Sequence, residues 1–112
     1  MPRRKEYFKW EIPKTVVELV RGICGDYKRR ENAIKYGNVT GAVLLRYIEL
    51  NNAIESALQE IEIGVRQTLF EDFLRKKGFD FSTANGEIYK NGYYMRKRRF
   101  VYTVAKELNL LQ

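Results

Sequence analysis

An apolar seam with near-heptad spacing runs through the middle of this 112-residue chain. The seam consists of Val43, Tyr47, Asn51, Ile54, Leu58, Ile61 and Val65. From Tyr47 onward its steps alternate between four and three residues, which places these side chains along one side of an α-helix. A helix of this kind must bury that side against another helix. The seam therefore predicts an all-α fold built from paired helices.

Asn51 is a polar residue in the middle of the seam. A polar side chain at such a position lowers stability but fixes the register and the number of partners. We expect a helix–helix interface formed by Tyr47, Asn51, Ile54 and Leu58. Its partner is either an upstream helix of the same chain, which gives a helical hairpin, or a second copy of the chain, which gives a homodimer with long paired helices.

Apolar residues also recur at helical spacing on both sides of the seam. We expect a first helix over residues 13–35, in which Cys24 is a small buried hydrophobe and the basic triplet at 28–30 is a solvated face. The seam helix follows, and Gly64 breaks or bends it. A further apolar helix then ends at Gly78, since glycine is a common helix C-cap.

The last quarter of the chain joins a run of four cations, residues 96–99, to an apolar helical pattern. One helical stripe is formed by Phe100, Val101, Val104, Ala105 and Leu108. The opposite side has no carboxylate and carries Met95, Arg98, Arg99, Tyr102, Thr103 and Lys106. The Asn91-Gly92 pair predicts a turn, after which the helix begins near Tyr93 and ends near Leu108. A short β-hairpin across the same turn is the alternative for residues 79–95.

Cations in the first turn of a helix oppose the helix dipole, so their placement here does not help folding. They form either a solvated basic face or a surface that contacts nucleic acid. In the second case, the residues expected to enter the major groove are Tyr93, Tyr94, Arg96, Arg98 and Arg99. The residues expected to hold phosphates are Lys90, Tyr102 and Lys106.

The charge of the chain is unevenly distributed. The net charge is +7, but residues 41–72 hold six acids against two bases, a local balance of −4 that leaves +11 for the flanking parts. A protein with an acidic middle and basic ends presents its charge in one direction. This distribution favours a polyanionic or acidic partner for the basic ends.

The sequence lacks the usual chemistry of catalysis. It has no histidine, which is the commonest general base and metal ligand, and its single cysteine cannot form a structural zinc site. Phosphate-binding loops and serine nucleophile motifs are also missing. We expect a non-enzymatic protein without cofactor or metal. Because no apolar run approaches the length of a membrane span and no signal peptide precedes the chain, we expect a cytoplasmic protein that contacts no membrane.

Residues 65 to 111 resemble the phage and prophage late-gene regulators of the RinA and ArpU type, whose C-terminal half is similar to the helix-turn-helix of sigma-factor region 4. The matching positions are Tyr93, Tyr94, Lys97, Val104, Ala105, Leu108 and Leu110. The helix-turn-helix would be degenerate, because Asn91 and Gly92 replace the usual serine or threonine cap. We therefore interpret residues 1–112 as a single domain, with a helical pairing region at 13–64 and a basic, helix-turn-helix-like region at 65–112.

The resemblance implies a DNA-binding transcriptional regulator that acts on double-stranded DNA in a bacterial host cell. The alternative is a non-enzymatic helical interaction or adaptor protein of phage origin, whose basic helix binds an acidic protein partner such as a surface of host RNA polymerase. The two hypotheses differ in salt dependence, because only polyanion binding releases many counterions and gives a steep logarithmic slope.

Overall fold

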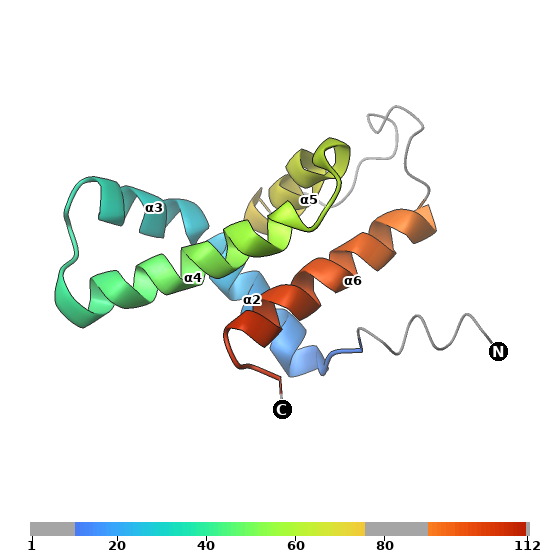
Figure 1. Cartoon of the computed structure of the whole chain (residues 1–112), viewed down its shortest axis with the longest axis horizontal. Coiled ribbons are helices and arrows are strands. Elements are labelled where there is room, and N and C mark those ends of the chain that lie inside the picture. The colour runs from blue at the N-terminus through green and yellow to red at the C-terminus, as the bar shows by residue number, and fades with distance from the viewer. Residues whose placement is uncertain (1–10, 76–89, 112) are drawn as a thin grey trace.

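The computed structural model describes residues 11–75 and 90–111, and all regular structure within these ranges is helical. The helices are α2 (Lys14–Gly25), α3 (Tyr27–Lys35), α4 (Gly41–Gln59), α5 (Ile63–Arg75) and α6 (Lys90–Glu107) (Figure 1). The prediction of an all-α fold is confirmed. The expected C-cap at Gly78 and most of the segment 79–95 lie outside the described residues.

The expected helix over residues 13–35 is divided at Asp26. This residue has φ −98° and ψ 5°, and its amide donates to the carbonyl of Ile23 at 3.3 Å, so the last turn of α2 tightens. The Asp26 carboxylate then pairs with Arg29 in the first turn of α3, where the helix dipole favours a negative charge. The break directs the far end of α3 away from α5 and α6 and along α4 (Figure 1).

Helices α3 and α4 form an antiparallel hairpin inside one chain (Figure 1). Asn51, only 6% exposed, lies between them: its Oδ1 accepts a hydrogen bond from Arg30 Nε at 2.7 Å, and its Nδ2 donates to the carbonyl of Tyr27 at 3.4 Å. The Tyr27 hydroxyl in turn donates to Glu55 at 2.8 Å. The seam is expected to pair either with an upstream helix of the same chain or with a second copy. Within the single chain it pairs with α3, which gives the helical hairpin.

Arg30 corrects the expectation of a solvated basic face at residues 28–30. Its side chain is buried against Asn51, while Lys28 and Arg29 are exposed. Burial lowers the pKa of the Arg30 guanidinium, and the hydrogen bond to Asn51 compensates part of the desolvation. Arg29 NH1 donates to the Tyr47 hydroxyl at 3.0 Å, which joins a second seam residue to α3.

The break between α4 and α5 falls at residues 60–62, earlier than the expected break at Gly64. Arg66, one turn into α5, donates from Nε to the carbonyl of Ile61 at 2.7 Å and from NH2 to that of Gln59 at 3.0 Å. These bonds satisfy carbonyl groups left open at the end of α4. The corner also allows both Ile61 and Val65 to enter the core.

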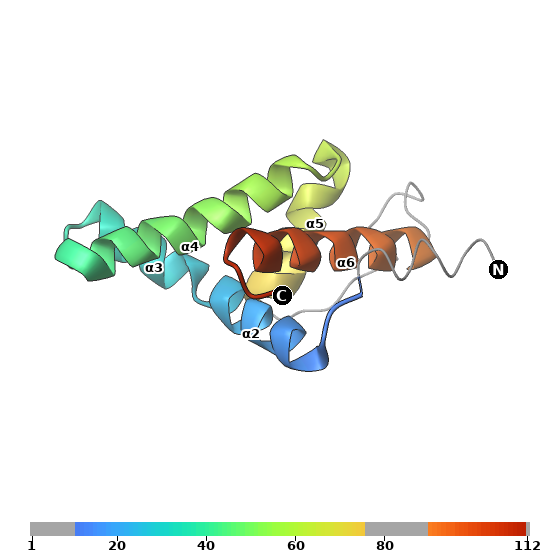
Figure 2. The same ribbon diagram turned by 60° about the horizontal axis from the view of Figure 1, so that its bottom comes forward.

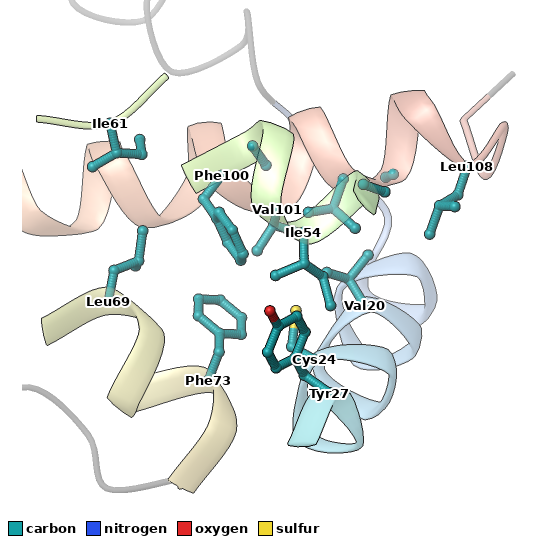
Figure 3. Close-up of a cluster of buried hydrophobic side chains, with 14 of the residues drawn as sticks. Val20, Cys24, Tyr27, Ile54, Ile61, Leu69, Phe73, Phe100, Val101 and Leu108 are labelled. Atoms are coloured by element: carbon teal, nitrogen blue, oxygen red, sulfur yellow. The ribbon is translucent and has the colours of Figure 1, made fainter. Parts of the chain in front are cut away.

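The core collects apolar side chains from every described helix (Figure 3). Its largest fully buried members are Tyr93, Phe73, Phe100, Ile54, Leu69, Val20, Val104 and Cys24. Helix α6 lies across α4 and α2 (Figures 1 and 2) and buries its whole expected apolar stripe. The rings of Phe73 and Phe100, with centroids 5.1 Å apart, join α5 to the same core.

Helix α6 begins earlier than expected and ends where expected. Lys90, Asn91 and Gly92 form part of its first turn, so the predicted turn at Asn91-Gly92 and the alternative hairpin there are both wrong. At the other end, Asn109 adopts φ 58°, and the amide of Leu110 donates to the carbonyl of Ala105 at 2.8 Å. This is the left-handed C-cap arrangement, which satisfies the last carbonyl groups of the helix.

Candidate nucleic-acid interface

The run of four cations in α6 is divided between the interior and the surface. Arg96 turns toward the corner between α4 and α5, where its Nε pairs with the Glu62 carboxylate. Its NH1 also donates to the carbonyl of Gly92 at 3.0 Å. The hydrogen bond from Arg96 holds the pKa of Glu62 below its usual value. The charge of Arg96 is therefore largely balanced within the chain.

Lys97 is held by a buried carboxylate on α5. Its Nζ lies 3.0 Å from Asp72 Oδ2 and 5.4 Å from the centre of the Phe73 ring. Asp72 is only 3% exposed, and the Lys97 side chain is 19% exposed. The aliphatic stem of Lys97 covers the core, and its ammonium group forms a partly buried ion pair.

Tyr93 supplies the second hydrogen bond to Asp72. Its side chain is fully buried, and its hydroxyl donates to the Asp72 carboxylate. Burial, reinforced by this acidic neighbour, raises the pKa of the phenol well above its usual value. The expectation that Tyr93 enters a DNA groove is therefore wrong for this structure, because the helical rotation that buries Phe100 also turns Tyr93 inward.

The outward side of α6 keeps the remaining expected residues. Tyr94, Met95, Arg98 and Lys106 are exposed, while Arg99, Tyr102 and Thr103 are partly exposed. The sequence contains no carboxylate from Lys90 to Lys106, and the first one follows at Glu107. Lys90 lies in the first turn of the helix, but its side chain is outside the described part of the structure. This side is a cationic and aromatic surface, which we call the α6 outer face.

An open cavity of about 410 Å³ borders the α6 outer face. Its polar lining is formed by Tyr94, Lys97 and Arg98 of α6 together with Glu11, which precedes α2. Its apolar lining includes Val17 of α2 and Phe73 of α5. The volume falls in the range of roughly 300–1,000 Å³ that is typical of ligand sites. Because the cavity is open, groups that approach the outer face from the side of α2 reach Tyr94 and Arg98.

Among the described residues, Cys24 and the paired cations of the α3–α4 hairpin lie outside this surface. Burial raises the pKa of the Cys24 thiol to about 12, so it is not a nucleophile at neutral pH. Lys28 lies 3.4 Å from Glu31 and Arg46 lies 2.7 Å from Glu49, both on the hairpin. Within residues 11–75 and 90–111, no three acidic, cysteine or histidine side chains converge as a metal site would require. Nor does any helix of these two ranges combine the length and apolarity needed to cross a bilayer.

Comparisons with protein-family models, curated proteins and solved structures found no match for this chain. The helix-turn-helix geometry is not seen in the described residues either. Helix α5 ends at Arg75 and α6 begins at Lys90, and the residues between them lie outside the described part of the structure, so the expected helix-turn-helix-like region at 65–112 is not tested. The resemblance to phage regulators therefore remains a hypothesis based on sequence.

Two acidic residues of this region were not identified from the sequence as functional. Asp72 falls between the apolar positions Leu69 and Phe73, so a helical wheel already places it beside the buried stripe. That position indicates a carboxylate in need of a partner. Glu62 gave no such signal, because its partner Arg96 is 34 residues further along the chain.

Proposed function

We propose that this protein is a non-enzymatic regulator that binds duplex DNA through the α6 outer face. The observation that carries the proposal is the composition of that face, which combines cations and tyrosines and has no carboxylate between Lys90 and Lys106. Phosphate groups attract such a surface without regard to base sequence, and the release of counterions drives binding. We propose double-stranded DNA as the ligand because the major groove is wide enough to admit an α-helix such as α6.

Arg98 and Arg99 are assigned the closest contacts. Both lie on the outward side of α6, where Arg98 is exposed and Arg99 is partly exposed. An arginine in this position binds a guanine edge with two hydrogen bonds or a phosphate with one or two. Tyr94, Tyr102 and Lys106 would fix the orientation of the helix by contacting the backbone.

The test is a fluorescence anisotropy titration of a random duplex at several salt concentrations. The double variant Arg98→Ala with Arg99→Ala should bind more weakly, and its logarithmic salt slope should flatten by roughly 1 to 2. Lys28→Ala with Lys35→Ala is the matched control, because it removes two exposed cations from α3 instead of α6. Both variants should melt close to the wild-type temperature, as surface substitutions usually do.

Two results would refute the proposal. If the wild type shows no salt-dependent affinity for any duplex, the protein does not bind DNA. If the control variant weakens binding as much as the α6 variant, net charge alone explains the affinity and the α6 outer face has no special role.

A second candidate is an adaptor whose α6 binds an acidic protein surface, for example on host RNA polymerase. The ion pairs of Arg96 with Glu62 and of Lys97 with Asp72 favour it, because they show that this helix accepts carboxylates as partners. Binding to a protein would give a shallow salt slope and no affinity for random duplex.

A further inference from the structure

The first half of α4 is apolar on sides that the structure leaves uncovered. From Gly41 to Leu50 only Arg46 and Glu49 carry charges. Tyr47 and Leu44 turn toward α3, yet Leu45 remains 68% exposed and Ile48 36% exposed. A helix that is apolar on several sides usually packs on more than one of them. Here the far end of the α3–α4 hairpin projects from α2, α5 and α6, so among the described residues none of these three helices covers this side (Figure 1).

We infer that Leu45 and Ile48 form a contact with a second copy of this chain. The two residues lie one turn apart on the side of α4 opposite to Ile54 and Ala57, which face the core. We call this stripe, with Asn52 as its next member, the α4 outer stripe. The inference is independent of DNA binding, because it uses another helix and another face.

The charges beside the stripe select the partner. Arg46 NH1 and Glu49 Oε1 lie 2.7 Å apart, so this part of the helix has no net charge. A nucleic acid needs several unpaired cations, and an anionic membrane surface needs a helix rich in lysine or arginine. A neutral, apolar stripe satisfies neither requirement. It fits an apolar protein surface with one cation and one carboxylate in complementary places.

A second α4 provides that surface. In an antiparallel pair with a two-fold axis beside residues 47 and 48, Leu45 and Ile48 of one copy pack against the same residues of the other. The same arrangement places Arg46 of each copy beside Glu49 of its partner. The two hairpins then form a four-helix arrangement with the α4 helices at its centre. The seam around Asn51 stays inside each hairpin, so the dimer uses a different side of α4 from the one that the seam spacing indicates.

The strength of such a dimer follows from its size. A single pair of helices buries less surface than the roughly 1,200–2,000 Å² of a stable complex, so the copies should dissociate at micromolar concentrations. Sedimentation velocity from low micromolar to millimolar protein measures this equilibrium. Leu45→Gln with Ile48→Gln should raise the dissociation constant by about 30-fold or more, because both central side chains are lost. Leu19→Gln is the control, since Leu19 on α2 is 49% exposed but lies outside the stripe.

Charge reversal tests the antiparallel pairing without changing the apolar residues. Arg46→Glu places two carboxylates together in the dimer and should weaken it, and adding Glu49→Arg should restore it. Both side chains are more than half exposed, so each variant should keep the wild-type circular dichroism spectrum. Ile48→Cys should form a disulfide between copies under mild oxidation, whereas Leu19→Cys should not. The native Cys24 is buried and does not compete.

The outcomes separate clearly. A wild type that stays monomeric up to millimolar concentration overturns the inference. A dimer that survives the glutamine double variant, or one that Leu19→Gln weakens equally, shows that another surface is used. Binding of the wild type to neutral or anionic lipid vesicles, abolished by the glutamine variant, would assign the stripe to a membrane instead. None of these results depends on whether the protein binds DNA.

Discussion

Replacing Lys97 with methionine tests whether this cation serves the fold. Methionine keeps an unbranched apolar stem over Phe73 but removes the ammonium group that pairs with Asp72 at 3.0 Å. Asp72 is 3% exposed and, among the described residues, would retain only the hydroxyl of Tyr93 as a partner. Loss of one partner of a buried pair costs about 3–5 kcal/mol. Because Tyr93 remains and the Lys97 side chain is 19% exposed, we expect about 3 kcal/mol, the lower end of this range.

Urea unfolding followed by circular dichroism measures this loss. A domain of this size is stable by about 5–15 kcal/mol, so the variant should remain folded but melt about 10 °C or more below the wild type. Lys106→Met is the matched control, because Lys106 is an exposed cation on the same helix. It should change the free energy of unfolding by no more than about 0.5 kcal/mol.

The double variant Lys97→Met with Asp72→Asn distinguishes an ion pair from two independent residues. Once Lys97 is absent, removing the charge of Asp72 should recover part of the lost stability, with an interaction energy of about 1–3 kcal/mol. Strict additivity of the two substitutions would refute the ion-pair argument. Equal effects of Lys97→Met and Lys106→Met would refute it as well, because they would place Lys97 in solvent.

Two further predictions concern buried polar groups. Asn51→Leu should lower the free energy of unfolding by about 1–3 kcal/mol, since it removes the acceptor of the buried Arg30 Nε and leaves the guanidinium only its bond to the Ile23 carbonyl and the Asp26 carboxylate 4.0 Å away among the described residues. A stabilised variant in thermal melts would contradict this. Stability should also fall as pH rises above about 9, because folding raises the pKa values of Cys24, Tyr27 and Tyr93, so the unfolded chain releases protons first. Urea midpoints measured from neutral to alkaline pH check this prediction. Tyr93→Phe should make the fall in stability above pH 10 less steep. An equally steep fall in that variant would exclude Tyr93 as a cause.

Periodic spacing explains what the sequence predicted correctly. The stripe that contains Phe100, Val104 and Leu108 is buried as the helical wheel indicates, because side chains four residues apart share a side whatever they pack against. The seam spacing likewise identified Asn51 as a residue turned toward another helix. For Asn51 the two kinds of information give opposite predictions: spacing alone predicts that Asn51→Leu stabilises the protein or changes its association state, whereas the hydrogen bond from the buried Arg30 predicts a loss of stability. Replacing a seam asparagine with leucine stabilises a helix pair only where no buried cation uses that asparagine as a hydrogen-bond acceptor.

Contacts between distant residues explain most of what the sequence did not predict. Arg96 and Glu62 are 34 positions apart, and Tyr93 and Asp72 are 21 apart, so local spacing carries no information about their pairing. The break at Asp26 has a different cause. A straight helix over residues 13–35 could not bury Cys24 in the core and also place Arg30 on α4, so tertiary packing prevails over local helix propensity.

The division of the cation run changes what can be expected of DNA binding. Each phosphate contact contributes about −0.9 to the logarithmic salt slope, so four contacts from residues 96–99 would contribute roughly −3.6. With Arg96 and Lys97 paired to Glu62 and Asp72, the run contributes only about half of that, roughly −1.8. The logarithmic salt slope of the wild type could be much steeper than the remaining cations of the α6 outer face can explain. In that case the Arg96–Glu62 pair, the Lys97–Asp72 pair or both must open when DNA binds. Since the pair with Asp72 is buried, opening it would cost stability, and the pair of Arg96 with the exposed Glu62 would open first.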